Sequence, residues 1–420
     1  MLDIELFRTN PQIIKDSQKK RNLPLEPVNQ VIDLDNHWRD VLQKLEKLKH
    51  ARNLASENIN KLKKAGKPVE AEIKKVKKIV DEIQVLEKEA EAFKAKRNEL
   101  LMNIPNIVDE SVPVGDASKN KVLEKWGKIP NFRFEPKGHE ELGKNLDVID
   151  IERAAKTTGA RFYYLKGDLV KLNYAIINFA LDLLKKKGFT LIQPPYMLRR
   201  NILSGAIPLA TFEEMIYKIQ DEDLYLIGTA EHALNAYYAD EILPATKLPI
   251  RFAGISPCFR KEAGAHGKDT KGIFRTHQFE KVEQFVFCRP ENAWKEFDLM
   301  LKNTKAIFRA LEIPYRTVVL SSEEIGRVAV KTVDIEGWFP SQNAYRELGS
   351  CSNCTDYQAR RSNIKFVDKG KIAFVATLNN TAVATERAIA CLMENHQQKD
   401  GSIKIPKALW PYTKFRVISC

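Results

Sequence analysis

Residues 250–287 read IRFAGISPCFRKEAGAHGKDTKGIFRTHQFEKVEQFVF. Two apolar runs enclose a segment rich in glycine and lysine, a pattern that predicts two antiparallel strands joined by a long hairpin loop. Alternate positions of a strand face the same side, so several polar and aromatic side chains can share one face. Such a face is unsuited to packing in a hydrophobic core, but it could bind a nucleotide and a small zwitterion together. Its residues are Arg260, Glu262, Arg275, Phe279 and Glu283.

A longer stretch, residues 28–104, has the pattern of a helical hairpin. It is almost free of glycine and proline, and its apolar residues recur at heptad spacing. Gly66 and Pro68 interrupt the pattern near its middle. The sequence therefore predicts an antiparallel coiled-coil arm of two helices, each roughly 50 Å long at about 1.5 Å per residue.

The predicted arm is basic, because residues 40–100 hold 16 Lys and Arg against 11 Asp and Glu. Two interpretations remain open. A solvated coiled coil can serve only to join two chains. Alternatively, the arm contacts the phosphate backbone of an RNA through lysines near its tip. Those lysines are Lys61, Lys63, Lys64 and Lys67.

The pattern divides the chain into three parts. Residues 1–104 form the helical domain, and the proline-rich residues 105–137 are interpreted as an irregular linker. Residues 138–420 mix short apolar runs with helical patterns, which predicts an α+β domain: an antiparallel β-sheet flanked by helices. Within it, residues 169–187 form an amphipathic helix, followed by a strand that runs into Pro194-Pro195.

The composition is that of a cytoplasmic protein with no membrane association. The chain has 420 residues, 44% of them hydrophobic, but no apolar run of about 18 residues that could span a bilayer. Its first residues lack the pattern of a secretory signal, and its six cysteines follow no regular spacing. The net charge of +13 is compatible with a polyanionic partner, and equally with a surface that favours solubility.

The arginines of the hairpin indicate the kind of chemistry. Joining a carboxylate to a phosphate brings like charges together, so such a site needs fixed cations and usually Mg²⁺. Arg260 and Arg275 supply two of these cations, and Arg387 on a predicted helix at 385–395 supplies a third. No Gly-x-x-x-x-Gly-Lys-Ser/Thr loop occurs, which excludes a P-loop for binding the phosphates.

Taken in order, these segments resemble the class II aminoacyl-tRNA synthetases, and in detail the seryl-tRNA synthetase family. Residues 378–387, which resemble motif 3, are closest to archaeal and eukaryotic members. The resemblance covers the whole chain and implies that the family's fold, reaction and homodimer are present here. The matching segments are the tRNA-binding arm, the helix and strand before Pro194-Pro195 (motif 1), residues 226–231, the hairpin (motif 2), residues 346–354, and residues 378–387.

The resemblance implies a serine site. Arg275 would pair with the serine carboxylate, and Glu283 would help to hold its ammonium and hydroxyl groups. A buried carboxylate can reject alanine, because the missing hydroxyl leaves that acceptor unpaired. The implied serine-binding residues are Thr229, Ala230, Glu231, Arg275, Glu283 and Thr381.

The resemblance also implies an ATP site. Arg260 would hold the α-phosphate, Arg387 the γ-phosphate end, and Phe279 would stack on adenine. Glu347 and Ser350 would hold Mg²⁺, which prefers oxygen ligands. The implied ATP-binding residues are Arg260, Lys261, Glu262, Thr276, Phe279, Glu347, Leu348, Gly349, Ser350 and Arg387. Glu386, next to Arg387, is expected to face away from the phosphates.

The function implied is that of a serine–tRNA ligase, which activates L-serine with ATP and transfers it to tRNA(Ser). Whether tRNA(Sec) is also charged stays open. Two alternatives are a related protein that charges a carrier protein, and a non-catalytic RNA-binding coiled-coil protein. Cys351 and Cys354 lack a second pair of ligands at zinc-site spacing, so we expect two packed thiols there.

Overall fold

The computed structural model describes residues 1–209, 213–262 and 272–419. The chain forms two compact units, residues 1–105 and residues 106–420. The hairpin loop at 263–271 lies outside the described residues.

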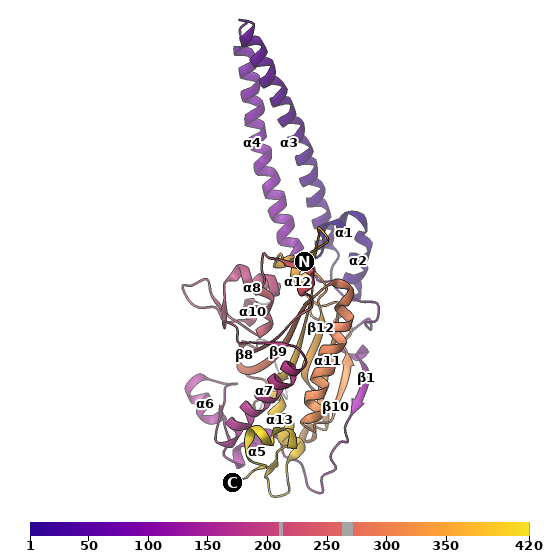
Figure 1. Cartoon of the computed structure of the whole chain (residues 1–420), viewed down its shortest axis with the longest axis vertical. Helices are drawn as coiled ribbons and strands as arrows, with labels where there is room; N and C mark the ends of the chain where they lie inside the picture. The colour runs from indigo at the N-terminus through magenta and orange to yellow at the C-terminus, as the bar shows by residue number, and fades with distance from the viewer. Residues whose placement is uncertain (210–212, 263–271, 420) are drawn as a thin grey trace. The chain divides into compact units, whose positions relative to one another are not determined.

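The first unit is helical, with α3 and α4 forming the antiparallel arm that the sequence predicts (Figure 1). The seam between these two helices buries Val41, Leu45, Ile83 and Ala90, while most of the remaining arm is exposed. At the base of the arm, the buried Asp35 carboxylate accepts hydrogen bonds from Arg8 and Arg97. The helices of this unit are α1 Ile4–Thr9, α2 Pro11–Lys20, α3 Glu26–Lys64 and α4 Glu70–Leu101.

The second unit is built on an eight-stranded sheet whose neighbouring strands are antiparallel, except for the short edge strand β4, which is parallel to β8. This is the α+β architecture that the sequence predicts. In spatial order the strands are β1 Lys121–Trp126, β10 Tyr315–Val319, β11 Lys331–Phe339, β12 Ala344–Asn353, β15 Ala376–Ala384, β9 Gln278–Cys288, β8 Ile250–Phe259 and β4 Thr190–Ile192.

Helices and small sheets complete the second unit. The helices are α5 His139–Asn145, α6 Ile151–Thr158, α7 Asp168–Lys186, α8 Arg200–Ala206, α10 Ala230–Ala236, α11 Ala293–Ala310, α12 Tyr357–Arg361, α13 Thr385–His396 and α14 Trp410–Thr413. Within the described residues, three small sheets have two strands each: β2 Ile149–Asp150 with β3 Tyr164–Leu165, β5 Met197–Leu198 with β6 Tyr225–Leu226, and β16 Ile403–Lys404 with β17 Val417–Ile418. A fourth has three strands, in the order β14 Lys371–Phe374, β13 Lys365–Asp368 and β7 Ile242–Pro244.

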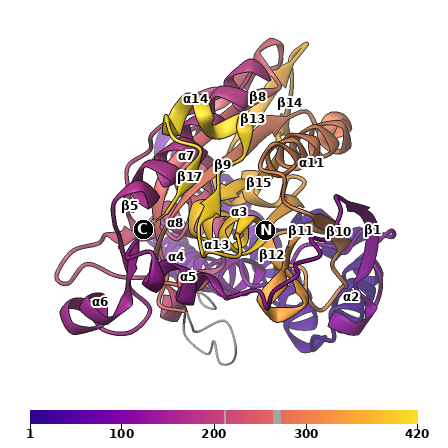
Figure 2. The same ribbon diagram turned by 90° about the horizontal axis from the view of Figure 1, so that it is seen from below.

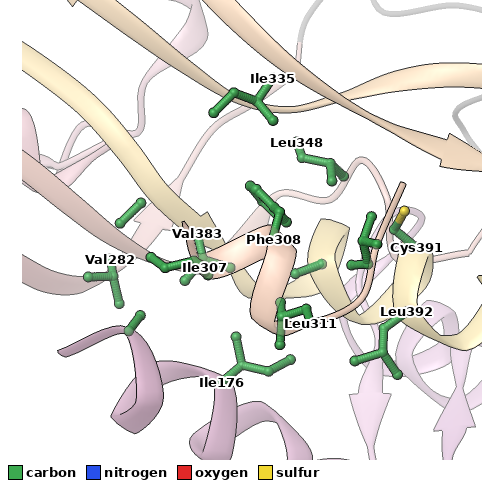
Figure 3. Packing of buried hydrophobic residues seen from close by; sticks show 14 of the residues in the cluster. Ile176, Val282, Ile307, Phe308, Leu311, Ile335, Leu348, Val383, Cys391 and Leu392 are labelled. Atoms are coloured by element: carbon green, nitrogen blue, oxygen red, sulfur yellow. The ribbon is translucent and has the colours of Figure 1, made fainter. Parts of the chain in front are cut away.

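The main core lies between the large sheet and the helices α7, α11 and α13. Ile176 of α7, Phe308 of α11 and Leu392 of α13 belong to one buried cluster with Val282 and Val383 of the sheet (Figure 3). The apolar stripe of α7 recurs every three or four residues, which is why this segment forms a helix with one buried face. α5 lies beside α13 in both ribbon views (Figure 1, Figure 2).

Residues 105–137, expected to be an irregular linker, contain the edge strand β1, which pairs with β10. This strand could not be seen in the sequence, because its residues are mostly exposed and charged residues interrupt both of its faces, so it lacks an apolar face. The trailing strand of the hairpin, β9, begins at Gln278. Ile273 and Phe274, which precede this strand, are buried without pairing in the sheet; the backbone N–H of Ile273 donates to His139 Nε2 instead.

Candidate active site

A cavity of about 490 Å³, its open mouth included, lies where the hairpin meets β12, β15 and α13. The hairpin presents its polar face here because β8 and β9 pair in regular register along their whole length. The cavity brings together most of the residues that the sequence predicts for the ATP site, with two of the serine site. The predicted residues in its lining are Arg260, Glu262, Arg275, Thr276, Phe279, Glu347, Leu348, Gly349, Thr381 and Arg387.

Cationic and aromatic side chains alternate around the cavity. The Arg260 guanidinium lies 5.3 Å from the ring centre of Phe279, and its Nε donates to the carbonyl of Gly228 at 3.1 Å. The Arg387 guanidinium lies 5.0 Å from the ring centre of Phe274. A planar cation beside an aromatic face forms a ready site for a base and its phosphates.

Arg275, the third arginine of the cavity, has fewer hydrogen-bond partners. Its Nη1 is 3.4 Å from Glu262 Oε2. Its Nε is buried and has no hydrogen-bond partner within residues 1–209, 213–262 and 272–419. A buried guanidinium N–H that lines a cavity is a strong donor for an incoming carboxylate or phosphate.

Three oxygen-bearing side chains gather at the β11 and β12 side of the cavity. Ser350 Oγ lies 2.5 Å from Asp334 Oδ1 and 3.4 Å from Glu347 Oε1, and Arg387 Nη1 lies 3.1 Å from the same Glu347 oxygen. The Arg387 charge holds the pKa of Glu347 below its ordinary value. Burial, together with repulsion from Glu347, raises the pKa of Asp334 well above its ordinary value.

This group of oxygens fits a hard divalent cation. Carboxylate and hydroxyl oxygens are the ligands that Mg²⁺ prefers. A cation would also relieve the electrostatic conflict that raises the pKa of Asp334, since it favours the charged form of both carboxylates.

A second set of polar groups lies behind the hairpin, and includes two acids. The buried Glu283 carboxylate is 2.5 Å from Lys281 Nζ and accepts from Thr229 Oγ1 at 3.3 Å. Glu231 accepts from Gln358 Nε2 at 2.8 Å and from Asn379 Nδ2 at 3.0 Å. Burial, and then the nearby Glu283 charge, raise the pKa of Glu231 to about 7.

The remaining predicted residues surround these groups. Thr229 caps the N-terminus of α10, where Ala230 is fully buried and Glu231 occupies the first turn. Lys261 follows Arg260, but its Nζ lies 5.8 Å from the ring centre of Tyr217, and it is not in the lining of the cavity. Its backbone N–H donates to Met215.

Comparison with known proteins gives matches along the whole chain. Residues 1–108 match the seryl-tRNA synthetase N-terminal domain, and residues 214–396 match the tRNA synthetase class II core domain (G, H, P, S and T). The serine–tRNA ligase of Nitrosopumilus maritimus is 48% identical over 415 residues, which cover 98% of each chain. The chain belongs to the seryl-tRNA synthetase family.

Solved members of the seryl-tRNA synthetase family share the fold of this chain. The crystal structure of seryl-tRNA synthetase from Pyrococcus horikoshii complexed with ATP is 46% identical, with a TM-score of 0.96 over 100% of this chain and 99% of that one. The cytoplasmic serine–tRNA ligase from Naegleria fowleri in complex with AMP is 35% identical, with a TM-score of 0.91 over the same shares. No described helix is both long and apolar enough to cross a membrane.

One expectation for this synthetase is wrong. Glu386 does not face away from the site: it lines the cavity and is 2% exposed. Both of its carboxylate oxygens accept from the backbone N–H of Glu280 at 3.0 Å, and one accepts from the hydroxyl of Tyr163. Burial raises the pKa of Glu386 to about 7, so its charge is reduced beside Arg387 near neutral pH. Glu386 lies in the first turn of α13, where the positive end of the helix dipole favours a carboxylate.

Sequence reasoning missed several residues of the synthetase's site. Lys281 could have been found, because it alternates with Phe279 and Glu283 along β9 and so shares their face. Asp334 could have been suspected as an acid between the buried Val333 and Ile335. Gln358 and Asn379 gave no local signal, because their role depends on which strands and helices become neighbours.

The two cysteines near the serine-site residues are buried free thiols. Cys351 Sγ donates to the carbonyl of Phe297, and Cys354 Sγ accepts from Asn379 Nδ2 at 3.5 Å. Burial raises the pKa of both thiols well above the ordinary value, which keeps them protonated. A protonated thiol is a poor metal ligand.

The four predicted tRNA-binding lysines lie at the tip of the synthetase's arm. Lys61, Lys63 and Lys64 occupy the last turn of α3, and Lys67 lies in the turn that follows. All four are exposed. Their amino groups are therefore free to approach a phosphate backbone.

Proposed function

We propose that this chain, a serine–tRNA ligase by its family, uses the cavity to activate L-serine with ATP and then charges tRNA(Ser). The observation that carries the proposal is the convergence of Arg260, Arg275 and Arg387 on one cavity that adjoins the buried acids Glu231 and Glu283. Anions on one side and an ammonium on the other are what ATP and serine present.

In the first step a serine carboxylate oxygen attacks the α-phosphorus of ATP. The bond between the α-phosphorus and the bridging oxygen breaks, and pyrophosphate leaves. Arg260 would hold the α-phosphate, and Arg387 the γ-phosphate end, while Phe279 stacks on adenine. No nucleophilic side chain is required, because the substrates react directly once they are aligned and their charges are neutralised.

Mg²⁺ bound by Glu347 and Ser350, with Asp334 beside them, would neutralise phosphate charge when present. The contacts among the side chains themselves already favour cation binding here. Arg387 keeps Glu347 charged, and Ser350 Oγ lies between the two acids. This arrangement favours a charged Glu347 carboxylate in the lining of the cavity.

Serine would be held from both ends. The buried Nε of Arg275, which has no hydrogen-bond partner among the described residues, supports a pairing with the serine carboxylate. Glu283 and Glu231 would accept from its ammonium and hydroxyl groups, with Thr229, Ala230 and Thr381 around the side chain. Lys281 balances the Glu283 charge until the substrate ammonium arrives.

In the second step a terminal ribose hydroxyl of the tRNA attacks the carbonyl of seryl-adenylate. An ester bond forms, the acyl–phosphate bond breaks, and AMP leaves. The exposed lysines at the tip of the arm support binding of the tRNA backbone there. Whether tRNA(Sec) is accepted depends on the same arm.

We also propose a homodimer formed through α7 and β4, and a cytoplasmic location. Exposed Tyr174 on α7 and Leu191 on the edge strand β4 support an apolar contact with a second copy. The buried free thiols are consistent with a reducing compartment.

The experiment is serine-dependent exchange of pyrophosphate into ATP, followed by aminoacylation of total tRNA. The proposal expects both activities, with serine as the preferred amino acid. Exchange without an acyl-tRNA product would favour the carrier-charging alternative. The absence of exchange from folded protein with Mg²⁺ would favour the non-catalytic RNA-binding alternative.

A further inference from the structure

A buried histidine and a buried glutamate lie outside the cavity and take no part in the proposed reaction. His139 is the first residue of α5, and Glu394 lies near the end of α13; their exposed fractions are 2% and 0%. His139 Nδ1 is 3.0 Å from Glu394 Oε1, and the backbone N–H of His139 donates to the same oxygen at 3.1 Å. The other oxygen accepts from the N–H and the hydroxyl of Ser341.

Glu394 is therefore fully engaged as an acceptor. A carboxylate that receives several hydrogen bonds has no donor to offer, so the proton of the shared contact belongs to His139 Nδ1. Glu140 also approaches Nδ1, but at 3.6 Å and from a partly exposed position. The three side chains could in principle surround an ion, yet the oxygens of Glu394 already have their partners.

The second ring nitrogen of His139 acts as an acceptor. The backbone N–H of Ile273 donates to Nε2 at 3.2 Å. This requires an unprotonated Nε2, which agrees with a proton on Nδ1. Gly272, at φ +71°, lies against the same nitrogen, and a Cβ there would come within 2.0 Å of it.

Ile273 begins the trailing stem of the hairpin, which leads directly into the cavity. Phe274, the next residue, lies under the Arg387 guanidinium, and Arg275 carries the unpaired buried N–H. Arg387 belongs to α13, the helix that also carries Glu394. One imidazole thus connects the hairpin stem to the helix that presents the opposite cation.

We infer that His139 is a positioning residue: held in its Nδ1–H form by Glu394, it fixes the trailing stem of the hairpin and so sets Phe274 and Arg275 opposite Arg387. The inference rests on the proposed function of the cavity. Misplacing a binding group by about 1 Å can cost on the order of a hundredfold in rate. The effect belongs to the ATP-dependent step, because that step needs both arginines at once.

The test compares His139→Ala, His139→Gln and a matched control, His396→Gln. His396 is a partly buried histidine at the end of α13, and its ring contacts the carbonyl of Leu311 and not the hairpin. In pyrophosphate exchange, His139→Ala should lower kcat/KM for ATP on the order of a hundredfold. Glutamine offers one acceptor and one donor, so His139→Gln should recover much of this loss. The control should leave kcat/KM nearly unchanged at equal thermal stability.

A spectroscopic measurement tests the same idea without activity. Nitrogen-15 NMR of the histidine side chains distinguishes the Nδ1–H from the Nε2–H form, and the His139 signal is the one absent from His139→Gln. The expected result is the Nδ1–H form. An Nε2–H signal, or equal losses of kcat/KM for His139→Ala and His396→Gln, would overturn the inference. Absence of exchange from the unaltered protein would instead overturn the proposed function, while leaving the NMR result to decide on His139.

Discussion

Glu283 is a charged residue in the interior of the second unit, and its partners explain why it can stay there. Lys281 and Thr229 satisfy its carboxylate, and burial raises the pKa of the nearby Glu231 to about 7, so that the charge of Glu231 is reduced near neutral pH. Two acids in one buried space cannot both be charged cheaply. A substrate ammonium would therefore bind with a gain that neither acid alone could provide.

We expect Glu283→Ala to impair the use of serine far more than the use of ATP. Loss of a buried charged acceptor costs about 2–3 kcal/mol, on the order of a hundredfold in kcat/KM for serine. Pyrophosphate exchange with each substrate varied in turn measures this. Glu336→Ala, which removes an acid that pairs with Arg316 on β10, is the control. Equal losses for both substrates would contradict the role of Glu283.

The raised pKa of Glu386 predicts that the free energy of unfolding depends on pH. Its pKa is about 7 in the folded chain, above the ordinary value of 4.5, so the folded state binds the proton more tightly than the unfolded state. Its contribution is fully present below the unfolded pKa and is lost as pH rises through the folded one, over roughly pH 4.5–7. The stability advantage of the unaltered protein over Glu386→Gln should fall by up to about 1.4 kcal/mol per pH unit across this window.

Denaturant unfolding at pH 5, 6, 7 and 8 measures that difference for Glu386→Gln. Glu336→Gln, which removes a carboxylate that pairs with Arg316 outside this group of contacts, is the matched control. A constant difference between the unaltered protein and Glu386→Gln across this range would show that the carboxyl titrates alike in both states.

The hairpin of β8 and β9 could be predicted from its sequence, because both strands are strongly apolar and flank a glycine-rich loop. The same holds for α3 and α4, whose heptads are long. β1 could not be predicted, since an exposed edge strand has no buried face to leave a pattern. The oxygen group of Asp334, Glu347 and Ser350 was only half predictable: it forms because β11 and β12 pair with Asp334 opposite Ser350.

The lysines at the tip of the arm can be replaced without disturbing its apolar seam, because they are exposed. Replacing Lys61, Lys63, Lys64 and Lys67 by alanine should weaken tRNA binding and lower the salt slope of log K by up to about 4. Pyrophosphate exchange should be unaffected. Binding and aminoacylation measured at several salt concentrations check both points.

A matched variant replaces four other exposed lysines, on α4: Lys74, Lys75, Lys77 and Lys78. It removes the same charge from the first turns of α4, just below the tip. A smaller loss than at the tip would support specific placement. Equal losses in both variants would show that only the total charge of the arm matters.

The two units of the molecule have separate cores, one along the seam of α3 and α4 and the other under the large sheet. We therefore expect residues 106–420, expressed alone, to fold and to retain serine-dependent pyrophosphate exchange. Aminoacylation should fall by at least tenfold, about 1.4 kcal/mol, because the arm is missing. Unimpaired charging by this fragment would contradict the proposed role of the arm.

The distribution of the cysteines lets the unfolding of the second unit be followed chemically. All six belong to residues 106–420, and the five described ones are buried thiols. An alkylating reagent reacts with the thiolate, so these sulfurs are shielded twice, by protonation and by packing. Brief exposure to such a reagent, followed by mass spectrometry of these five cysteines, would therefore measure how often the second unit opens. Fraying of the arm would leave no label, because residues 1–105 contain no cysteine.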